Sequence, residues 1–428
     1  MTSPTSAPAC SFARKEWRSS LDSCDVLVVG AGHAGLAAAK AAAQHGANVI
    51  LIDDNPAPGG QIARAKHGRI DSNIRKSLDD FLSAGGSIRQ GESVVDVPSS
   101  NRATTAGAKG KGEISFRNLI LATGSRELFL PFPGWTLPGV MGAGGLQALA
   151  KGGLDVRKKR IVVAGSGPLL MPVAHFLTAA GALVHGPFEQ VSYLTLGSFA
   201  LKALANGKAR DLAGYASVLP HYRPNTWVVE AHGSSKLESV QLSTGQVIDC
   251  DYLACSYGLV PNTELARLIG CELVGGFVKV DADQRTSVEN VFCVGEPTGI
   301  GGHEKGSTEG FVAGMIAAGE ESALKGPIQV SKLNKFVDVL AKTFKLRPEL
   351  LALADPDTIV CRCEDVSYER LKGQPSLRDA KLQTRCGMGP CQGRICGPAM
   401  QHLFGWEADT VRPPIIPVPL ADLVSQEA

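Results

Sequence analysis

The sequence predicts an α/β protein with two Rossmann-like dinucleotide-binding domains, the second inserted in the first, and a small C-terminal helical domain. Three observations predict this arrangement. A Gly-x-Gly-x-x-Gly turn at 30–35 follows an apolar strand and opens an Ala-rich helix, and a second Gly-x-Gly turn occurs at 165–167. Five of the eleven cysteines fall between residues 361 and 396. Glycine turns of this kind bind dinucleotides at strand–helix junctions, and dense cysteine groups hold metals or clusters.

The first fold is predicted over residues 22–129, after a tail at 1–21 that has no apolar core and that we expect to be disordered. Each glycine of the turn has a mechanical role. Gly30 permits the tight strand-to-helix turn, Gly32 lets a pyrophosphate lie against the backbone, and Gly35 lets the helix pack on the strand. These residues therefore form one candidate cofactor site.

The second predicted strand, residues 48–53, ends in an acid. Asp53 is placed to accept the ribose hydroxyls of a dinucleotide, and Asp54 is the neighbouring candidate for the same role. A carboxylate at this position also repels a 2′-phosphate. A complete strand, turn, helix, strand and acid is a much stronger signal than the glycine turn alone, and it predicts a bound dinucleotide.

Three later segments resemble those of flavoproteins with two dinucleotide-binding domains, the group that includes thioredoxin and glutathione reductases. A strand at 118–122 ends in Thr123 and Gly124, a segment at 290–294 ends in Gly295 and Glu296, and the loop 58–61 contains Gly60 and Gln61. The resemblance implies FAD in the first fold, completed by residues 283–325. It places the 58–61 loop beside the flavin and Glu296 where the family has an aspartate for the ribityl chain. It also implies a helix from about 309 to 323 with its N-terminus directed at the cofactor.

The inserted domain is predicted over residues 130–282. Gly165 and Gly167 repeat the first turn, but Leu170 stands at the third glycine position. A helix toward residue 180 and a strand at 182–185 follow, and Glu189 is the candidate ribose acid. The resemblance implies NAD(P) here. A nicotinamide site and a retained fold that no longer binds both remain open.

The C-terminal part is predicted as a linker and helix at 326–355, a cluster domain at 356–405 and a tail at 406–428. Thiolates in glycine-rich loops hold iron–sulfur clusters, and the alternative is structural zinc, which usually shows paired Cys-x2-Cys elements. The spacing therefore favours a cluster. It resembles the bacterioferritin-associated ferredoxin (BFD) pattern, which implies a [2Fe-2S] cluster. That pattern implies four ligands, with Cys386 as a spare or as a replacement for one of them: Cys361, Cys363, Cys391 and Cys396.

Composition excludes several classes. The formal net charge is +2, so no strong field points to nucleic acid, and no apolar run is long enough for an integral membrane segment. The cysteines outside the C-terminal group show no framework spacing, which predicts a reducing, cytoplasmic setting.

Nearly the whole chain resembles the α-type flavoprotein subunits of heteromeric opine oxidases, D-hydroxyproline and proline dehydrogenases, sarcosine oxidase and hydrogen cyanide synthase. The resemblance rests on the glycine turns and on Pro-Gly-Gly-Gln-Ile-Ala-Arg, Gly-Glu-Pro-Thr-Gly-Ile-Gly-Gly, Cys-Arg-Cys-Glu-Asp-Val and Thr-Arg-Cys-Gly-Met-Gly-Pro-Cys-Gln-Gly-Arg. It implies that a β-type partner oxidises a CH-NH substrate at its own flavin, and that this chain passes the electrons onward to an acceptor. No constellation of acid, base or nucleophile in the sequence indicates a catalytic residue of its own.

Two other functions remain open. A free-standing NAD(P)H-dependent reductase of a small redox protein requires the second glycine turn to bind nicotinamide. A regulatory protein with vestigial cofactor folds requires neither turn to bind.

Overall fold

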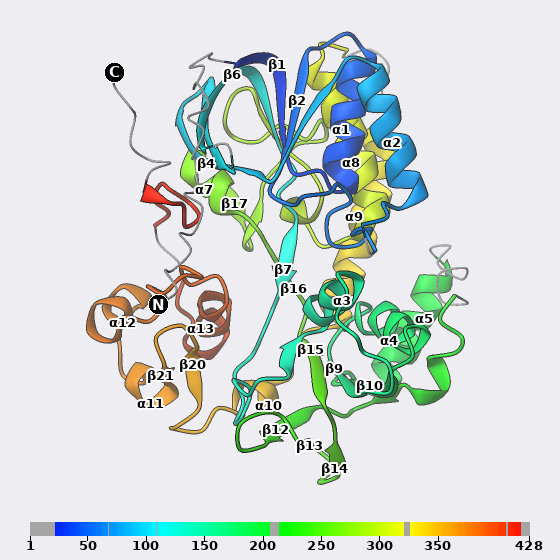
Figure 1. The fold of residues 1–428 in the computed structure, drawn as a ribbon, viewed down its shortest axis with the longest axis vertical. Coiled ribbons are helices and arrows are strands. Elements are labelled where there is room, and N and C mark those ends of the chain that lie inside the picture. The colour runs from blue at the N-terminus through cyan, green and yellow to red at the C-terminus, as the bar shows by residue number, and fades with distance from the viewer. Residues whose placement is uncertain are drawn as a thin grey trace, which may run out of the picture.

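The computed structural model describes residues 22–66, 68–108, 110–205, 214–320, 326–407 and 410–420. The predicted tail at 1–21 and the end of the predicted tail at 406–428 lie outside these ranges. The chain forms three units, two sheet domains and a smaller C-terminal domain beside the second of them (Figure 1). None of the helices in the described ranges has the length and apolarity needed to cross a membrane.

The first domain is built on a sheet of order β3-β2-β1-β6-β5-β4, with β19 also paired to β6. The pairs among β3, β2, β1, β6 and β19 are parallel, and β4 and β5 form an antiparallel edge. Its elements are β1 (Asp22–Val29), α1 (His33–Gln44), β2 (Val49–Asp53), α2 (Ser72–Ser83), β3 (Ser87–Gln90), β4 (Glu92–Ser99), β5 (Arg102–Gly107), β6 (Gly110–Leu121), β19 (Val291–Cys293) and α8 (Gly302–Ala317). All of β2 is buried, as expected for a parallel strand covered on both faces.

Helices α1 and α8 pack closely on one face of this sheet (Figure 1). A Cβ atom added at Gly310 would lie 2.1 Å from the carbonyl oxygen of Ala34, and one added at Gly314 would lie 2.3 Å from that of Ala38. The helix predicted near 309–323 in fact begins at Gly302 and ends at Ala317. The prediction was wrong because the polar first turns of α8 hide its periodicity, and part of that polar sequence is buried.

The second domain has a parallel sheet of order β11-β10-β9-β15-β8. Its elements are β8 (Val140–Gly142), α3 (Ala143–Lys151), β9 (Arg160–Gly165), α4 (Leu170–Ala179), β10 (Leu183–Glu189), α5 (Tyr193–Ala205), η1 (Leu219–His221), β11 (Arg223–Pro224) and β15 (Tyr252–Ser256). A small antiparallel sheet of β12 (Val228–His232), β13 (Ser239–Leu242) and β14 (Val247–Asp249) packs against it. The strand predicted at 182–185 continues to Glu189, with an irregular register between His185 and Phe188.

Two antiparallel strands connect the sheet domains, β7 (Ser125–Glu127) and β16 (Leu259–Pro261) (Figure 1). The elements after β16 are α7 (Glu264–Ile269), β17 (Leu273–Val274), β18 (Phe277–Val278) and η2 (Glu296–Thr298). Leu265, Ala266 and Val278 are buried in one apolar cluster with Leu27 of β1 and Ile114 of β6. The inserted domain therefore ends near β16 and not at residue 282, because these apolar side chains pack on the first sheet.

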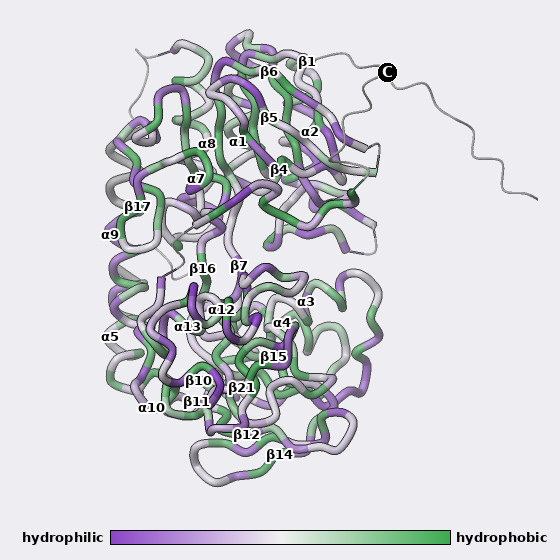
Figure 2. Tube along the Cα trace, turned by 90° about the vertical axis from the view of Figure 1, so that its left-hand side faces the viewer, coloured by the Kyte–Doolittle hydropathy of each residue, from purple (hydrophilic) through white to green (hydrophobic). Residues whose placement is uncertain are grey.

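The C-terminal domain is small and mainly helical. Its elements are β20 (Ile359–Cys361), β21 (Val366–Ser367), α11 (Tyr368–Leu371), α12 (Leu377–Thr384) and α13 (Cys396–Phe404). The link to it is formed by α9 (Gly326–Thr343) and α10 (Pro348–Leu351), and α9 runs along one side of the molecule from the first domain to α5 (Figure 2). The core of the C-terminal domain includes Val366, Leu371 and Met400, and Phe404 stacks between Tyr368 and Trp406.

The α1–α8 contact predicts a stability difference between two helical glycines. Gly314→Ala should lower the free energy of unfolding by about 1–3 kcal/mol, because the added methyl group overlaps the carbonyl of Ala38. Gly197→Ala in α5 is the matched control, since a methyl group there meets no atom within 4 Å; it should be neutral or stabilise by up to about 1 kcal/mol. Urea denaturation of both variants tests this, and equal losses would contradict it.

Candidate cofactor sites

The glycine turn after β1 is shaped for a close backbone approach. Gly30 has φ 106°, and a Cβ atom there would lie 2.2 Å from the carbonyl oxygen of Ala122 at the end of β6. A Cβ atom at Gly35 would lie 1.7 Å from the carbonyl oxygen of Gly30. Gly32, by contrast, meets only the Cα atom of Gly60 at 3.9 Å. The turn is therefore tight on its protein side, while Gly32 leaves space for a ligand.

Helix α1 begins at this turn with no side-chain cap and no acidic residue in its first turn. Its first amides remain available to an anion, because the N-terminal N–H groups of a helix have no partner within the helix. The rings of His33 in the turn and His303 at the start of α8 lie 5.4 Å apart. Burial and the nearby His303 lower the pKa of His33. This end of the first domain thus fits a pyrophosphate.

The two candidate ribose acids differ in their surroundings. Asp53 is buried, and its carboxylate accepts hydrogen bonds from the amide of Ala31 in the turn and from the amide and side chain of Asn55. Asp54 is exposed and accepts a hydrogen bond from Asn55 Nδ2 at 2.7 Å. Asp53 therefore stabilises the turn, and Asp54 is the acid of the pair that faces solvent.

The 58–61 loop lies beside the turn, as the contact between Gly60 and Gly32 establishes. Arg64 donates hydrogen bonds to Asn55 Oδ1 at 3.0 Å and to Gln61 Oε1 at 3.1 Å. Its Nε atom is buried and has no hydrogen-bond partner. The loop therefore presents Gln61 and one unpaired donor next to the candidate cofactor site.

The segment after β19 is held by a buried ion pair that sequence reasoning missed. Lys305 Nζ and Glu309 Oε1 are 2.7 Å apart, and each side chain is 1% exposed. Glu309 accepts the amide of Gly295 at 2.8 Å, and Lys305 donates to Thr298 Oγ1 at 2.7 Å. The signal in the sequence was Lys and Glu at helical i, i+4 spacing among glycines. The pair fixes the loop that carries Gly295 and Glu296.

Glu296 has one oxygen in use and one free. Its Oε1 accepts the amide of Gly302 at 2.9 Å, whereas Oε2 is buried with no hydrogen-bond partner. Burial raises the pKa of Glu296, and the Gly302 amide opposes this. A buried carboxylate oxygen without a donor is costly, so this atom fits a ligand hydroxyl such as those of a ribityl chain.

Thr123 and Gly124 lie at the junction between the sheet domains. Asn262, in the return from the second domain, accepts a hydrogen bond from Thr123 Oγ1 through its carbonyl at 2.6 Å and donates through Nδ2 to the Thr123 carbonyl at 2.9 Å. The backbone amide of Asn262 donates to the carbonyl of Gly124 at 3.0 Å. The Arg126 guanidinium donates to Asn262 Oδ1 at 2.7 Å and pairs with Glu264 Oε1 at 2.9 Å. These contacts hold together the two segments that connect the sheet domains.

The second glycine turn makes the same close contact with a neighbouring strand but follows a different backbone course, since Gly167 has φ 106° where Gly32 has φ −74°. A Cβ atom at Gly167 would meet nothing within 4 Å. Gly165 has φ 138°, and a Cβ atom there would lie 1.8 Å from the carbonyl oxygen of Ser256. Glu189 ends β10 and is fully buried. Its carboxylate accepts the amide of Gly167 at 2.8 Å and the hydroxyl of Tyr222 at 3.1 Å. Glu189, the predicted ribose acid of this fold, therefore already makes its hydrogen bonds within the protein.

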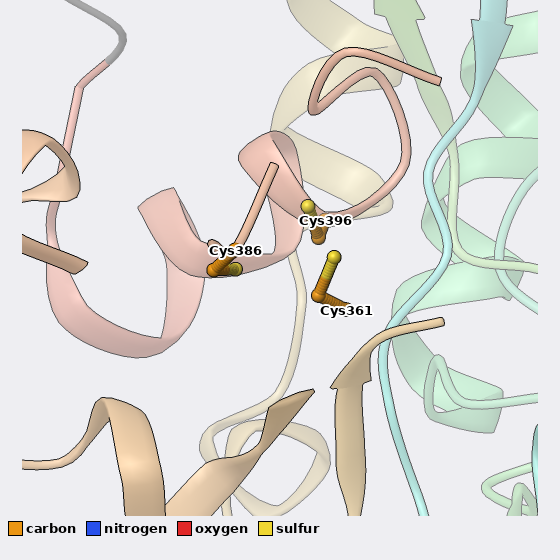
Figure 3. A group of neighbouring side chains, drawn as sticks. All are labelled: Cys361, Cys386 and Cys396. Carbon is orange, nitrogen blue, oxygen red and sulfur yellow. The ribbon is translucent and has the colours of Figure 1, made fainter. Parts of the chain in front are cut away.

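The five cysteines of the C-terminal domain gather around one point. The sulfurs of Cys361, Cys386 and Cys396 all lie within 4.8 Å of one another. Figure 3 shows these three side chains. A cavity of about 210 Å³ borders the group and is lined by Cys361, Cys363, Cys391 and Cys396 together with Phe129, Trp135 and strand β8. The structure thus brings Cys361, Cys386 and Cys396 within ligand reach of one another and places Cys363 and Cys391 at the adjoining cavity.

Cys386 differs from the other four cysteines. It does not line the cavity, and its sulfur lies 3.5 Å from Met400 Sδ in the domain core. Hydrogen bonds from Cys386, Cys396 and the Gly387 amide lower the pKa of Cys361 to about 2, whereas the bond to Cys361 is the main cause that raises the pKa of Cys386 to about 12. Hydrogen bonds with Cys361 and Cys386 raise the pKa of Cys396 as well, so it is the absence of Cys386 from the cavity lining that sets this residue apart.

Known proteins resemble this chain over most of its length. Residues 24–310 match the family described as pyridine nucleotide-disulphide oxidoreductase. The A subunit of opine oxidase from Agrobacterium tumefaciens is 30% identical, covering 94% of this chain and 92% of that protein. The HcnB subunit of hydrogen cyanide synthase from Pseudomonas aeruginosa is 30% identical, covering 92% and 97%. L-proline dehydrogenase from P. horikoshii shares the fold, with a TM-score of 0.70 at 19% identity over 97% of this chain and 82% of that one. The resemblance expected from the motifs is confirmed.

The ion pair in α8 predicts a strong non-additive effect on stability. Lys305→Met should lower the free energy of unfolding by about 3–5 kcal/mol, because Glu309 is left charged and buried without its partner. The double variant Lys305→Met, Glu309→Leu should recover much of this loss. Urea denaturation of the single, the double and the exposed control Lys279→Met measures the coupling. Additive losses would contradict a coupled buried pair.

Proposed function

Because the chain belongs to the pyridine nucleotide-disulphide oxidoreductase family, we propose that it is the electron-transferring flavoprotein and iron–sulfur subunit of a heteromeric amino-acid or opine oxidase or dehydrogenase. The observation that carries the proposal is the five-cysteine domain docked against both dinucleotide folds. That domain lies outside the 24–310 stretch that the family covers. A thiol-rich site next to a dinucleotide fold provides two redox sites in one chain.

In this proposal FAD lies in the first domain. Gly32 and the free N-terminus of α1 receive its pyrophosphate, Asp54 or Asp53 its ribose, and Glu296 Oε2 its ribityl hydroxyls. Bound FAD supplies an acceptor of two electrons that can release them singly. The buried Lys305–Glu309 pair holds the loop that carries Gly295 and Glu296 in place for this contact.

Cys361, Cys363, Cys391 and Cys396 would hold a [2Fe-2S] cluster in the cavity they line. Gly389 supports this loop, because a Cβ atom there would lie 2.4 Å from Cys363 Cβ. Arg126 of β7 donates to the carbonyl of Arg394 at 2.9 Å, which joins the cluster loop to the strand that leaves the first domain. Such anchors hold a cluster at a fixed distance from a cofactor.

Substrate oxidation is placed on a partner subunit. The related opine oxidase and hydrogen cyanide synthase chains are both named as subunits, which supports a hetero-oligomer with a β-type, substrate-oxidising flavoprotein acting on CH-NH donors. An external acceptor then receives the electrons. The free-standing NAD(P)H-dependent reductase is disfavoured by the burial of Glu189.

The ligand assignment predicts different iron contents for two cysteine variants. Cys391→Ser should lose most of its iron and acid-labile sulfide, because it removes a ligand. Cys386→Ala should keep both, since Cys386 does not line the cavity, and should shift the reduction potential by removing a thiol donor near Cys361. Cys250→Ser, a buried cysteine of the second domain, is the control. Loss of iron from Cys386→Ala to the level of Cys391→Ser would overturn the assignment.

The proposal as a whole is tested by copurification from the native host. The expected sample contains flavin, iron and sulfide together with a second flavoprotein chain, and the complex reduces an artificial electron acceptor with an amino acid or opine. Isolation of the chain without a partner, together with rapid reduction of its flavin by NADH or NADPH, would contradict the heteromeric proposal.

A further inference from the structure

The end of β10 is followed by a fully buried glutamine that faces the second glycine turn. Gln190 donates through Nε2 to Ser166 Oγ at 3.0 Å, within the turn, and to the carbonyl of Lys345 at 3.1 Å. Its Oε1 accepts the amide of Arg347 at 3.2 Å. One side chain thus satisfies three groups and joins the turn to a segment more than 150 residues away.

The same segment, residues 344–351, is held at both ends. The Arg347 guanidinium lies 4.7 Å from the ring centroid of Trp227 and donates to Asn225 Oδ1 at 2.8 Å. Leu350 of α10 is 1% exposed and belongs to the apolar core of the second domain. At the other end Phe344 meets the ring of Phe199 in α5 at 5.1 Å. Figures 1 and 2 show α10 beside β12 and the end of the second sheet.

Because Lys345 and Arg347 bond the residue that follows β10, this segment lies at the carboxyl end of that strand, the edge where the adenosine part of a dinucleotide binds in a Rossmann fold. The Glu189 carboxylate and the Gly167 amide would recognise a dinucleotide here. They are already bonded to each other, and Glu189 also accepts the Tyr222 hydroxyl. Burial raises the pKa of Glu189 to about 7, whereas a ribose acid must present a charged carboxylate to its ligand.

We propose that residues 344–351 of this chain occupy the dinucleotide edge of the second Rossmann fold, which therefore binds no NAD(P) and instead anchors the cluster domain. A dinucleotide would have to displace Gln190's contacts, the Arg347–Trp227 stack and a buried leucine, and its apparent affinity falls by the fraction of molecules in the open state. The fold retains its glycine turn because the turn packs against Ser256. In place of a dinucleotide, this fold holds residues 344–351 of its own chain.

The anchoring role connects to the rest of the domain interface. Soon after Arg347 the chain enters the C-terminal domain. There the carbonyl of Ile359 accepts a hydrogen bond from Nε1 of Trp135, a residue of the second domain. Trp135 also lines the cysteine cavity. Residues 344–351 and the cysteine cavity thus both contact the second domain. Release of residues 344–351 would therefore loosen the cysteine group.

The test uses the full-length protein with its first site saturated with FAD. Calorimetric titration with NAD+ and NADH should give no saturable binding up to about 1 mM, and hydrogen exchange should show residues 344–351 protected with or without NAD+. Gln190→Ala should speed exchange of the Arg347 amide by about tenfold, because that amide loses its acceptor. Arg347→Ala, which leaves the buried core intact, should speed exchange across 344–351. The exposed Arg370→Ala is the matched control and should change nothing there.

Saturable binding of NAD+ to the wild type that protects Ser166 and Gly167 would overturn the proposal. So would unchanged exchange of residues 344–351 in both variants. These outcomes are independent of the proposed function, which fails instead through absence of a partner chain or of iron.

Discussion

The close contact of each glycine turn with the strand end beside it is the constraint on which the arrangement depends. A Cβ atom at Gly30 would lie 2.2 Å from the Ala122 carbonyl, and one at Gly165 would lie 1.8 Å from that of Ser256. Such contacts fix how closely each turn approaches the strand end beside it. The same contact therefore occurs in both folds, although the turns differ beyond it, since α1 begins at His33 and α4 only at Leu170.

The difference between the two folds comes from what faces each turn. In the first domain, Gly32 faces a glycine loop, and a free carboxylate oxygen of Glu296 and a free Arg64 Nε stand nearby. In the second, Glu189 and Gln190 are buried and fully engaged. Glu296 and Arg64 thus leave hydrogen bonds for a ligand of the first turn to complete, whereas Glu189 and Gln190 have theirs within the protein.

The C-terminal domain is held by contacts from both sheet domains. Arg126 reaches the carbonyl of Arg394, Trp135 reaches that of Ile359, and the amide of Ile415 donates to Val95 of β4 at 3.0 Å. Electron transfer between a flavin and a cluster requires a fixed separation. Three hydrogen bonds from separate elements restrict the movement of the C-terminal part of the chain relative to the two sheet domains.

The sequence by itself determined the parts with a strict local requirement. The glycine turns, the helix at 33–44 and the cysteine group follow from backbone sterics and ligand chemistry, which short motifs record. Only the tertiary structure decided that 264–278 joins the first domain, that Lys305 and Glu309 form a buried pair, and that Gln190 links the second turn to Lys345 and Arg347. These features depend on which side chains meet across long separations in the chain, and no local pattern carries that information.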